Sequence, residues 1–200
     1  MDRVSEFKGL HRDKRVFVLA SGPSLAKLDL APLTRRIVIG LNRSFLAFAQ
    51  PHYHCVMDQR LFDLYPEELR HSRYLFTVRD RPFGIPITLL GSRGFSFDLE
   101  QGIYSGYTIA HFALQLAVYM GFAEIFFLGL DLQLAGHHTH FFGHDHRSAN
   151  HESTEFPKMK ACLTDAAELL RPTGVRVYNC SPTSTLECFP EATYEWALAR

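Results

Sequence analysis

Residues 15–25, RVFVLASGPSL, decide the fold that the rest of the chain has to adopt. Residues 16–19 are an unbroken apolar run, β-branched and aromatic enough to form a strand that is buried on both faces. The small polar turn that follows contains Ser21, Gly22, Pro23 and Ser24. Glycine lets the backbone approach a ligand closely, proline is tolerated where a helix starts, and serine can cap bare amides. The stretch therefore predicts a strand, a turn and a helix N-terminus that form a phosphate-sized anion site at the carboxyl edge of a parallel sheet.

The turn at residues 20–24 matches neither of the two common phosphate-binding loops. It contains one glycine and no lysine, whereas the GxGxxG fingerprint needs three glycines and the Walker loop needs a lysine. A tight strand-to-helix turn that binds nothing is therefore the alternative interpretation.

Composition limits the class of protein. The chain has 200 residues, 46% of them hydrophobic, which suits one domain over residues 1–200 with its core at about 15–190. Lys+Arg and Asp+Glu balance at 21 each, so no net charge is present that would recruit nucleic acid. The four cysteines lack CxxC spacing, which favours reduced thiols and a cytoplasmic protein. We expect neither a signal peptide nor a membrane span, and peripheral contact with a membrane stays open.

Strands and helices alternate along the rest of the chain. Further buried strands are predicted at residues 36–41, 52–57, 74–78, 124–130 and 175–178. Helices are predicted after the first strand, after residue 61 with Pro66 at a helix start, and at residues 108–120 and 158–170. Residues 82–101 have no clear period and are interpreted as a surface segment that covers the site. This order predicts a Rossmann-like, doubly wound, mostly parallel α/β sheet with a short lid-like insertion at about 132–157.

Polar side chains follow three of the predicted strands. Asn42, Asp58 and Asp131 each come directly after an apolar run, where parallel strands open towards a ligand crevice. Asp58 alone would more often be a helix cap, which is its alternative role. A hydroxyl-rich turn at residues 179–185 follows the last strand.

Several short motifs, taken in order, resemble one known group of proteins. They are SGPSL, GLNRSF, MDQRLF, YSGYTIAHFALQLAVYMGFAEIFFLGLDL, HFFGHD and VYNCSPTSTLECFP. In this order they resemble bacterial sialyltransferases that use CMP-sugars, together with the lipopolysaccharide- and flagellin-glycosylation proteins around them. They are also similar to the archaeal-type 6-hydroxymethylpterin diphosphokinase family.

The resemblance implies roles for individual residues. Its nucleotide-binding set comprises Gly22, Pro23, Ser24, Asn42, Asp58, Ser105 and Gly106, and Asp58 stands where the sialyltransferases have an asparagine. His144 of HFFGHD matches their general base. The sequence departs from the family at Gly102, where the sialyltransferases have an arginine. It departs again near Gln133 and Thr139, where they have phosphate-binding tyrosines, and the lid is shorter.

Six histidines lie between His137 and His151, and they permit three interpretations. The segment is a solvated loop, or a metal site completed by Asp131 or Asp145, or the source of a general base. An unperturbed imidazole titrates near ~6.5 and so accepts a hydroxyl proton at neutral pH. In this third interpretation Asp131 or Asp145 would orient the ring of the base, which makes Asp131 a catalytic candidate as well. The resemblance selects His144 as the base, with His140 as the second candidate.

Together these features predict an inverting glycosyltransferase of surface glycan or lipopolysaccharide synthesis. A histidine would deprotonate a hydroxyl of a glycan or glycolipid acceptor, which attacks a nucleotide-activated sugar, most simply a CMP-sugar. Donors from residues 21–24, Ser105, Ser181 and Thr183 would hold the leaving phosphate, so no metal is required. A Mg²⁺-dependent pyrophosphokinase acting on a pterin-like compound, with Asp58 and Asp131 as metal ligands, is one alternative. A non-catalytic nucleotide-binding partner is the other; the sugar, the acceptor and the oligomeric state stay open.

Overall fold

The centre of the molecule is one parallel sheet of seven strands. The computed structural model describes residues 2–133, 140–143 and 149–200. The strand order is β5-β4-β3-β2-β1-β8-β9, and every neighbouring pair is parallel. The strands are β1 (Arg15–Leu19), β2 (Val38–Leu41), β3 (Tyr53–Cys55), β4 (Leu75–Val78), β5 (Ile85–Ile87), β8 (Glu124–Leu128) and β9 (Arg176–Asn179). Because the order reverses at β1, this sheet is the predicted doubly wound, Rossmann-like arrangement, and the prediction is confirmed.

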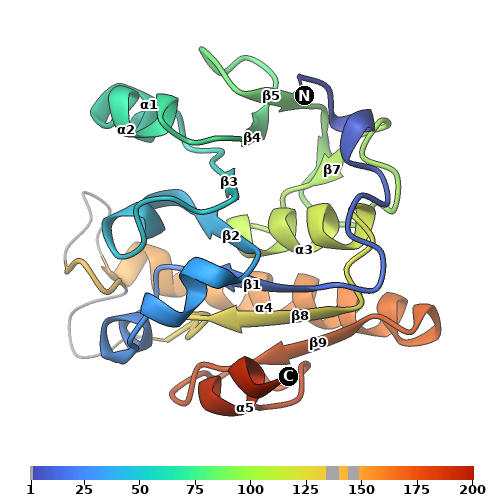
Figure 1. The fold of residues 1–200 in the computed structure, drawn as a ribbon. Helices are drawn as coiled ribbons and strands as arrows, with labels where there is room; N and C mark the ends of the chain where they lie inside the picture. The colour runs from blue at the N-terminus through green and yellow to red at the C-terminus, as the bar shows by residue number, and fades with distance from the viewer. Residues whose placement is uncertain (1, 134–139, 144–148) are drawn as a thin grey trace.

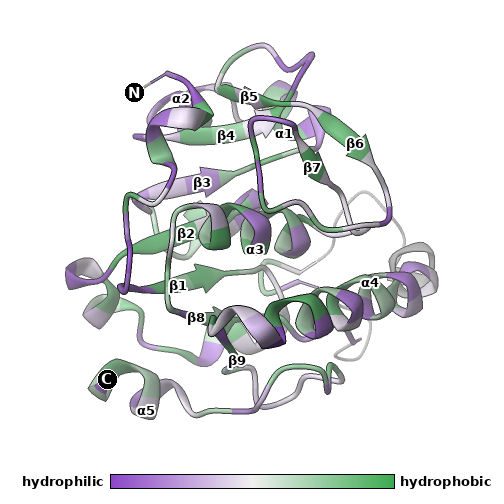
Figure 2. Ribbon diagram, turned by 90° about the vertical axis from the view of Figure 1, so that its right-hand side faces the viewer, coloured by the Kyte–Doolittle hydropathy of each residue, from purple (hydrophilic) through white to green (hydrophobic). Residues whose placement is uncertain are grey.

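Alternate side chains of the strands pack against different layers. Val16 and Val18 of β1 belong to the cluster that includes α3 (Ile109–Tyr119) and α4 (Ala149–Leu170). Phe17 and Leu19 pack on the opposite side, against residues of α5 (Tyr194–Ala199) and of the short 3-10 helices that follow β1. Figures 1 and 2 show α3 and α4 together on one face of the sheet. Burial on both faces explains why the β1 sequence is apolar at successive positions.

Short 3-10 helices follow β1 and β2 on the second face, which they cover together with α-helices such as α5. They are η2 (Pro23–Lys27), η3 (Ala31–Arg35) and η4 (Asn42–Leu46), and η1 (Val4–Phe7) and η5 (Arg171–Thr173) lie elsewhere. The expected helix after β1 is therefore wrong in type and length. It ends where the Leu28 amide donates to the Leu25 carbonyl, and Asp29 then caps the amide of Ala31, which starts the next turn. A five-residue 3-10 turn provides little of the helix dipole on which the predicted anion site depended.

Two further regions correct the sequence predictions, and a third confirms one of them. Residues 82–101 contain β5 and β6 (Leu89–Gly91), and β6 pairs with β7 (Ile103–Tyr104) in a separate two-stranded sheet. The region after residue 58 forms α1 (Gln59–Leu64) and α2 (Pro66–Arg70), as its helical pattern predicted. The last long helix, α4, begins at Ala149 rather than 158, within the segment predicted to be lid-like.

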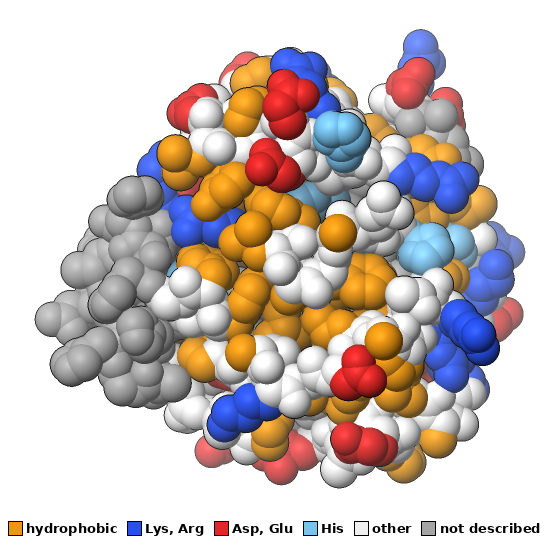
Figure 3. All heavy atoms as spheres, turned by 60° about the vertical axis from the view of Figure 1, so that its left-hand side comes forward, with side chains coloured by type: hydrophobic (Ala, Val, Ile, Leu, Met, Phe, Trp, Pro, Cys, Tyr) orange, Lys and Arg blue, Asp and Glu red, His pale blue; other side chains and the backbone are white. Residues whose placement is uncertain are grey.

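One face of the molecule exposes apolar side chains over a broad area (Figure 3). The 3-10 helices η2 and η3 and the segment that follows η4 contribute to an open hollow of about 710 Å³, lined by residues that include Leu28, Leu30 and Phe48. Among the residues that the structure describes, no helix combines the length and the apolar character that crossing a bilayer requires.

Candidate functional site

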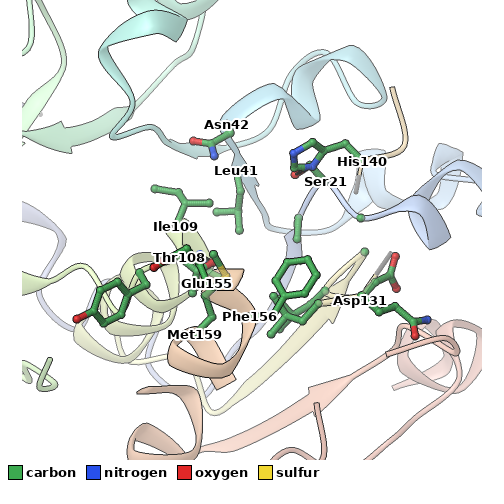
Figure 4. Close-up of a pocket in the computed structure, with 18 of the residues that line it drawn as sticks. Ser21, Leu41, Asn42, Thr108, Ile109, Asp131, His140, Glu155, Phe156 and Met159 are labelled. Carbon is green, nitrogen blue, oxygen red and sulfur yellow. Dashed lines mark hydrogen bonds between the residues drawn. The ribbon is translucent and has the colours of Figure 1, made fainter. Parts of the chain in front are cut away.

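A cleft of about 430 Å³ opens at the carboxyl ends of the central strands (Figure 4). The loops after β1, β2, β3 and β8 form one side, and the start of α3 and the N-terminal part of α4 form the other. Its polar lining includes Ser21, Asn42, Asp58, Arg60, Thr108, Asp131, Gln133, His140 and Glu155. Its apolar and aromatic lining includes Leu41, Tyr107, Ile109, Phe156 and Met159. None of residues 82–101 belongs to this lining, so the expectation that this segment covers the site is wrong.

The turn after β1 receives a carboxylate from its own chain. The Ser24 amide donates to Asp131 Oδ2 at 2.8 Å, and the Gly22 amide donates to the Gly129 carbonyl at 2.8 Å. A Cβ on Gly22 would lie 2.4 Å from Asp131 Oδ2 and 2.5 Å from the Gly129 oxygen. Glycine is therefore required by the close approach of Asp131, and the anion that the turn binds is this buried side chain. Pro23 and Ser24 are not among the residues that line the cleft.

Asp131 also joins β8 to the hydroxyl-rich turn that follows β9. The Thr183 hydroxyl donates to Asp131 Oδ1 at 3.3 Å, and the Thr185 amide donates to the Asp131 carbonyl at 3.1 Å. One residue earlier, the Leu130 amide donates to Ser181 Oγ at 2.8 Å. Ser181 and Thr183 lie outside the cleft lining, so in the described structure they hold its back wall together.

Asn42 presents an unsatisfied side-chain oxygen at the end of β2. Its φ of +46° lies in the left-handed region, which asparagine tolerates better than most residues. Its carbonyl accepts a hydrogen bond from Nε2 of the buried His54 at 2.7 Å. Its Oδ1 is buried and has no hydrogen-bond partner among the described residues, while Asn42 lines the cleft. Because a buried polar atom is costly to leave unpaired, this oxygen is suited to a ligand donor.

His54 is a neutral histidine in the sheet. Its Nδ1 lies 2.8 Å from Ser72 Oγ, and burial lowers its pKa to about 4, although the bond to Asn42 opposes the shift. A carbonyl only accepts, so Nε2 carries the proton and the Ser72 hydroxyl donates to Nδ1. Both ring nitrogens are therefore satisfied in the neutral state.

The lowered pKa of His54 predicts acid lability. Above pH 6.5 both the folded and the unfolded state are neutral at this residue, whereas between pH 6.5 and 4 only the unfolded state gains the proton. The free energy of unfolding should therefore fall by about 2 kcal/mol between pH 7 and pH 5 from this residue. Urea titrations of wild type and His54→Leu measure it. His11, His52 and His111, whose pKa values burial also lowers, contribute to both proteins. Equal pH slopes for the two proteins would remove His54 as a cause.

His140 reaches the cleft from the segment after β8. Its Nδ1 lies 3.1 Å from Ser21 Oγ, and its ring stacks on Phe142 with centroids 4.8 Å apart. The buried guanidinium of Arg43 lies 4.9 Å from the centroid of the same Phe142 ring. The structure thus brings His140 to Ser21, as Figure 4 shows. His144, the first candidate base, lies outside the described residues, as do His137, His138, Thr139, Asp145 and His146.

Asp58 both caps a helix and lines the cleft, the two roles that its position in the sequence allowed. Its Oδ1 accepts the Arg60 amide at 3.0 Å and caps α1. Its Oδ2 lies 2.9 Å from the Arg60 guanidinium, and both residues line the cleft. An ion-paired carboxylate therefore stands where the resemblance leads one to expect a neutral amide.

Ser105 and Gly106 form a turn beside the cleft and are not part of its lining. Their amides donate to the carbonyls of Gly91 and Ser92, which joins the turn to β6. Gly106 has a φ of +57°, and a Cβ there would lie 2.2 Å from Cγ of the buried His111. The motif therefore places the next residues, Tyr107 and Thr108, at the cleft.

The charges of the described lining do not by themselves favour an anion. Asp58, Asp131 and Glu155 face one guanidinium, that of Arg60. Glu155 also pairs with Lys158 outside the lining, at 2.9 Å. Within the described part of the chain, no group of three or more His, Cys, Asp or Glu side chains is placed to hold a metal ion.

Comparison with known proteins finds similarity at the level of the fold. No family model matches the sequence, and no curated protein matches it. The chain is similar to a structure of the sialyltransferase CstII from Campylobacter jejuni in complex with cytidine-5'-monophosphate, described as a substrate analogue. The two share 15% identity over 91% of this chain and 86% of that chain, with a TM-score of 0.58. A second structure, with CMP-3FNeuAc, gives 15% identity over 90% and 86%, with a TM-score of 0.52.

These matches establish a sialyltransferase-like fold, in agreement with the resemblance read from the sequence motifs. Neither structure bears on the similarity to pterin diphosphokinases, which stays a prediction. Sequence reasoning missed several lining residues, namely Arg60, Tyr107, Glu155, Phe156 and Met159. Glu155 and Phe156 lie in the part of α4 that was assigned to a lid, and Met159 lies at the start of the helix predicted at residues 158–170. No polar strand end marked any of the three.

Proposed function

We propose that this chain is a glycosyltransferase that binds a CMP-activated sugar in the cleft of Figure 4. The proposal is carried by the buried, unpaired Oδ1 of Asn42 in a cleft at the switch point of the sheet. The fold that it shares with two CMP-ligand complexes of a sialyltransferase supports the choice of nucleotide. The Asn42 oxygen would accept a hydrogen bond from an amino or hydroxyl group of the nucleotide.

The reaction would be a direct displacement. A histidine of the segment after β8 takes the proton from an acceptor hydroxyl, and the oxygen attacks the anomeric carbon as the bond to the CMP phosphate breaks. Attack from the face opposite the leaving group inverts the anomeric centre. The Ser21 hydroxyl and the Arg60 guanidinium are the described cleft groups that would interact with the leaving phosphate. The acceptor would be a glycan or glycolipid, which also leaves room for peripheral contact with a membrane.

The test is a binding screen followed by turnover. A ligand that binds only the folded state raises the unfolding temperature in proportion to the logarithm of its concentration over Kd. CMP should raise it more than UMP, GMP or ATP do. Release of CMP from a panel of CMP-sugars should then persist in EDTA. Stabilisation by ATP alone, with turnover abolished by EDTA, would instead support the Mg²⁺-dependent pyrophosphokinase. Stabilisation by CMP without release from any donor would support a non-catalytic binding partner.

Asn42→Ala should weaken CMP binding while the chain still folds. A lost hydrogen bond to a neutral partner is worth about 0.5–1.5 kcal/mol, which is a several-fold rise in Kd. Isothermal titration calorimetry on the folded variant measures this change. Gln50→Ala is the matched control, because this exposed amide lies in the other hollow and should leave Kd unchanged. Equal affinities of wild type and Asn42→Ala would place the nucleotide away from this residue.

A further inference from the structure

His54 is a buried histidine that does not line the cleft, although it is bonded to a residue that does. It lies in the middle of β3, between β2 and β4, and is fully buried. Its register partner on β2 is Gly40, two residues before Asn42. Its Nε2 lies 2.7 Å from the Asn42 carbonyl oxygen and its Nδ1 lies 2.8 Å from Ser72 Oγ. The ring therefore connects the backbone of Asn42 to a serine that lies just before β4.

The bond to His54 accompanies an unusual backbone conformation. Asn42 leaves the extended conformation of β2 and takes a φ of +46°, the first residue of η4. A non-glycine residue pays a free-energy cost in this region, so neighbouring contacts must hold it there. The same residue lines the cleft and carries the buried, unpaired Oδ1. The carbonyl that His54 binds and the unpaired side-chain oxygen are thus on one residue, so a constraint on its backbone also constrains its side chain.

We infer that His54 is the positioning residue of the nucleotide site: its Nε2–H holds the Asn42 carbonyl and thereby aims the Asn42 side chain into the cleft. The inference rests on the proposed function for the identity of the ligand, and on the described contacts alone for the geometry. His54 would act only through Asn42, because the residue itself lies outside the cleft lining. The pKa of about 4 supports this role, since the ring stays neutral and keeps its tautomer over the physiological range.

Two substitutions separate this role from simple packing. His54→Leu removes the donor while keeping an apolar side chain of similar bulk. His54→Gln can place its amide N–H near the position of Nε2 and so retains the donor. Ser72→Ala is a third variant that removes the partner of Nδ1 and leaves the bond to Asn42 in place. It also provides a milder perturbation if His54→Leu folds poorly.

The first measurement does not depend on any ligand. The chain has three asparagines, Asn42, Asn150 and Asn179, so asparagine-selective ¹³C and ¹⁵N labelling gives three sets of signals. Asn42→Ala identifies the Asn42 set, whose Cα and Cβ shifts report its backbone conformation. We expect them to move in His54→Leu and to stay close to wild type in His54→Gln and Ser72→Ala. Unmoved signals in His54→Leu, or equal changes in the Leu and Gln variants, would overturn the inference.

The second measurement is CMP affinity by calorimetry in a double-mutant cycle. His54→Leu should raise Kd by about two- to tenfold in the wild-type background, the range expected for one misplaced hydrogen bond. It should raise Kd no further in the Asn42→Ala background, because the two residues act as one unit. An equal rise in both backgrounds would show that His54 acts by another route and would overturn the inference. If the wild type binds no CMP while the Asn42 signals still move in His54→Leu, the proposed function fails and the positioning role stands.

Discussion

Gly22→Ala is expected to lower the free energy of unfolding by about 3 kcal/mol, the upper end of what an inserted carbon atom costs in a packed site. The new Cβ would lie 2.4 Å from Asp131 Oδ2 and 2.5 Å from the Gly129 carbonyl oxygen. Neither atom is at the far end of a flexible side chain, because the Ser24 amide holds the carboxylate and the second atom is backbone. For a chain of this length the unfolding temperature should fall by roughly 6–12 °C.

The control is a glycine at which an added Cβ would have no neighbouring atom within 4 Å. Gly174 has a φ of +78° and no atom within 4 Å of the added carbon, so Gly174→Ala measures backbone strain alone. We expect it to cost about 1 kcal/mol. Thermal and urea unfolding of both variants give the comparison.

A double-mutant cycle with Asp131→Ala tests the cause. Asp131→Ala by itself leaves the Ser24 amide without its acceptor and should cost about 1–3 kcal/mol. In that background Gly22→Ala should cost at least about 1 kcal/mol less than in the wild type, because one of the two close contacts is gone. Additive costs would mean that Asp131 does not lie against Gly22 as the structure places it.

The sheet could be predicted from the sequence because a strand that is buried on both faces is an unbroken run of apolar residues. The apolar runs before Asn42, Asp58 and Asp131 correspond to β2, β3 and β8, and parallel strands bring their carboxyl ends to one edge. That rule also predicted that these three side chains would share a cleft, as they do. The strand β5 was missed because it is three residues long and contains Pro86, which weakens a strand pattern.

The contacts inside the site could not be predicted in the same way. The bond between the Ser24 amide and Asp131 joins residues 107 positions apart, and no periodicity encodes it. A Gly-Pro-Ser turn that binds a carboxylate of its own chain has the same sequence pattern as a turn that binds a phosphate. The sequence likewise predicts His54 only as one residue of a short strand. The structure shows that its ring is hydrogen-bonded to the Asn42 carbonyl.

His144→Ala is expected to reduce turnover by about 10²–10⁴, the usual contribution of a positioned general base, and to leave CMP affinity nearly unchanged. The HFFGHD motif matches the position of the base in the sialyltransferases that the sequence resembles. His140 is the rival candidate, because its Nδ1 lies 3.1 Å from Ser21 Oγ and it lines the cleft. The two residues are four apart in the sequence, so both substitutions have to be compared on the same donor and acceptor.

The pH profile of the rate separates the two histidines. In the wild type the rate should rise with pH as the base loses its proton and level off above its pKa, and the variant without the base should lose that rise. Ser21→Ala adds a second criterion, because it removes the hydroxyl beside His140 and should displace the rising limb only if His140 is the base. His71→Ala, an exposed histidine at the end of α2 and outside the cleft lining, should leave both rate and profile unchanged.

Each result assigns the base. Loss of turnover and of the rising limb in His144→Ala, with His140→Ala retaining most activity, supports the role that the motif implies for His144. The reverse result, together with a displaced limb in Ser21→Ala, moves the base to His140, where the described geometry already provides a partner for the ring. Full activity of both variants on a confirmed donor would show that neither imidazole takes the proton. Glu155, the carboxylate on the α4 side of the cleft, would then be the next candidate, because it lines the same space.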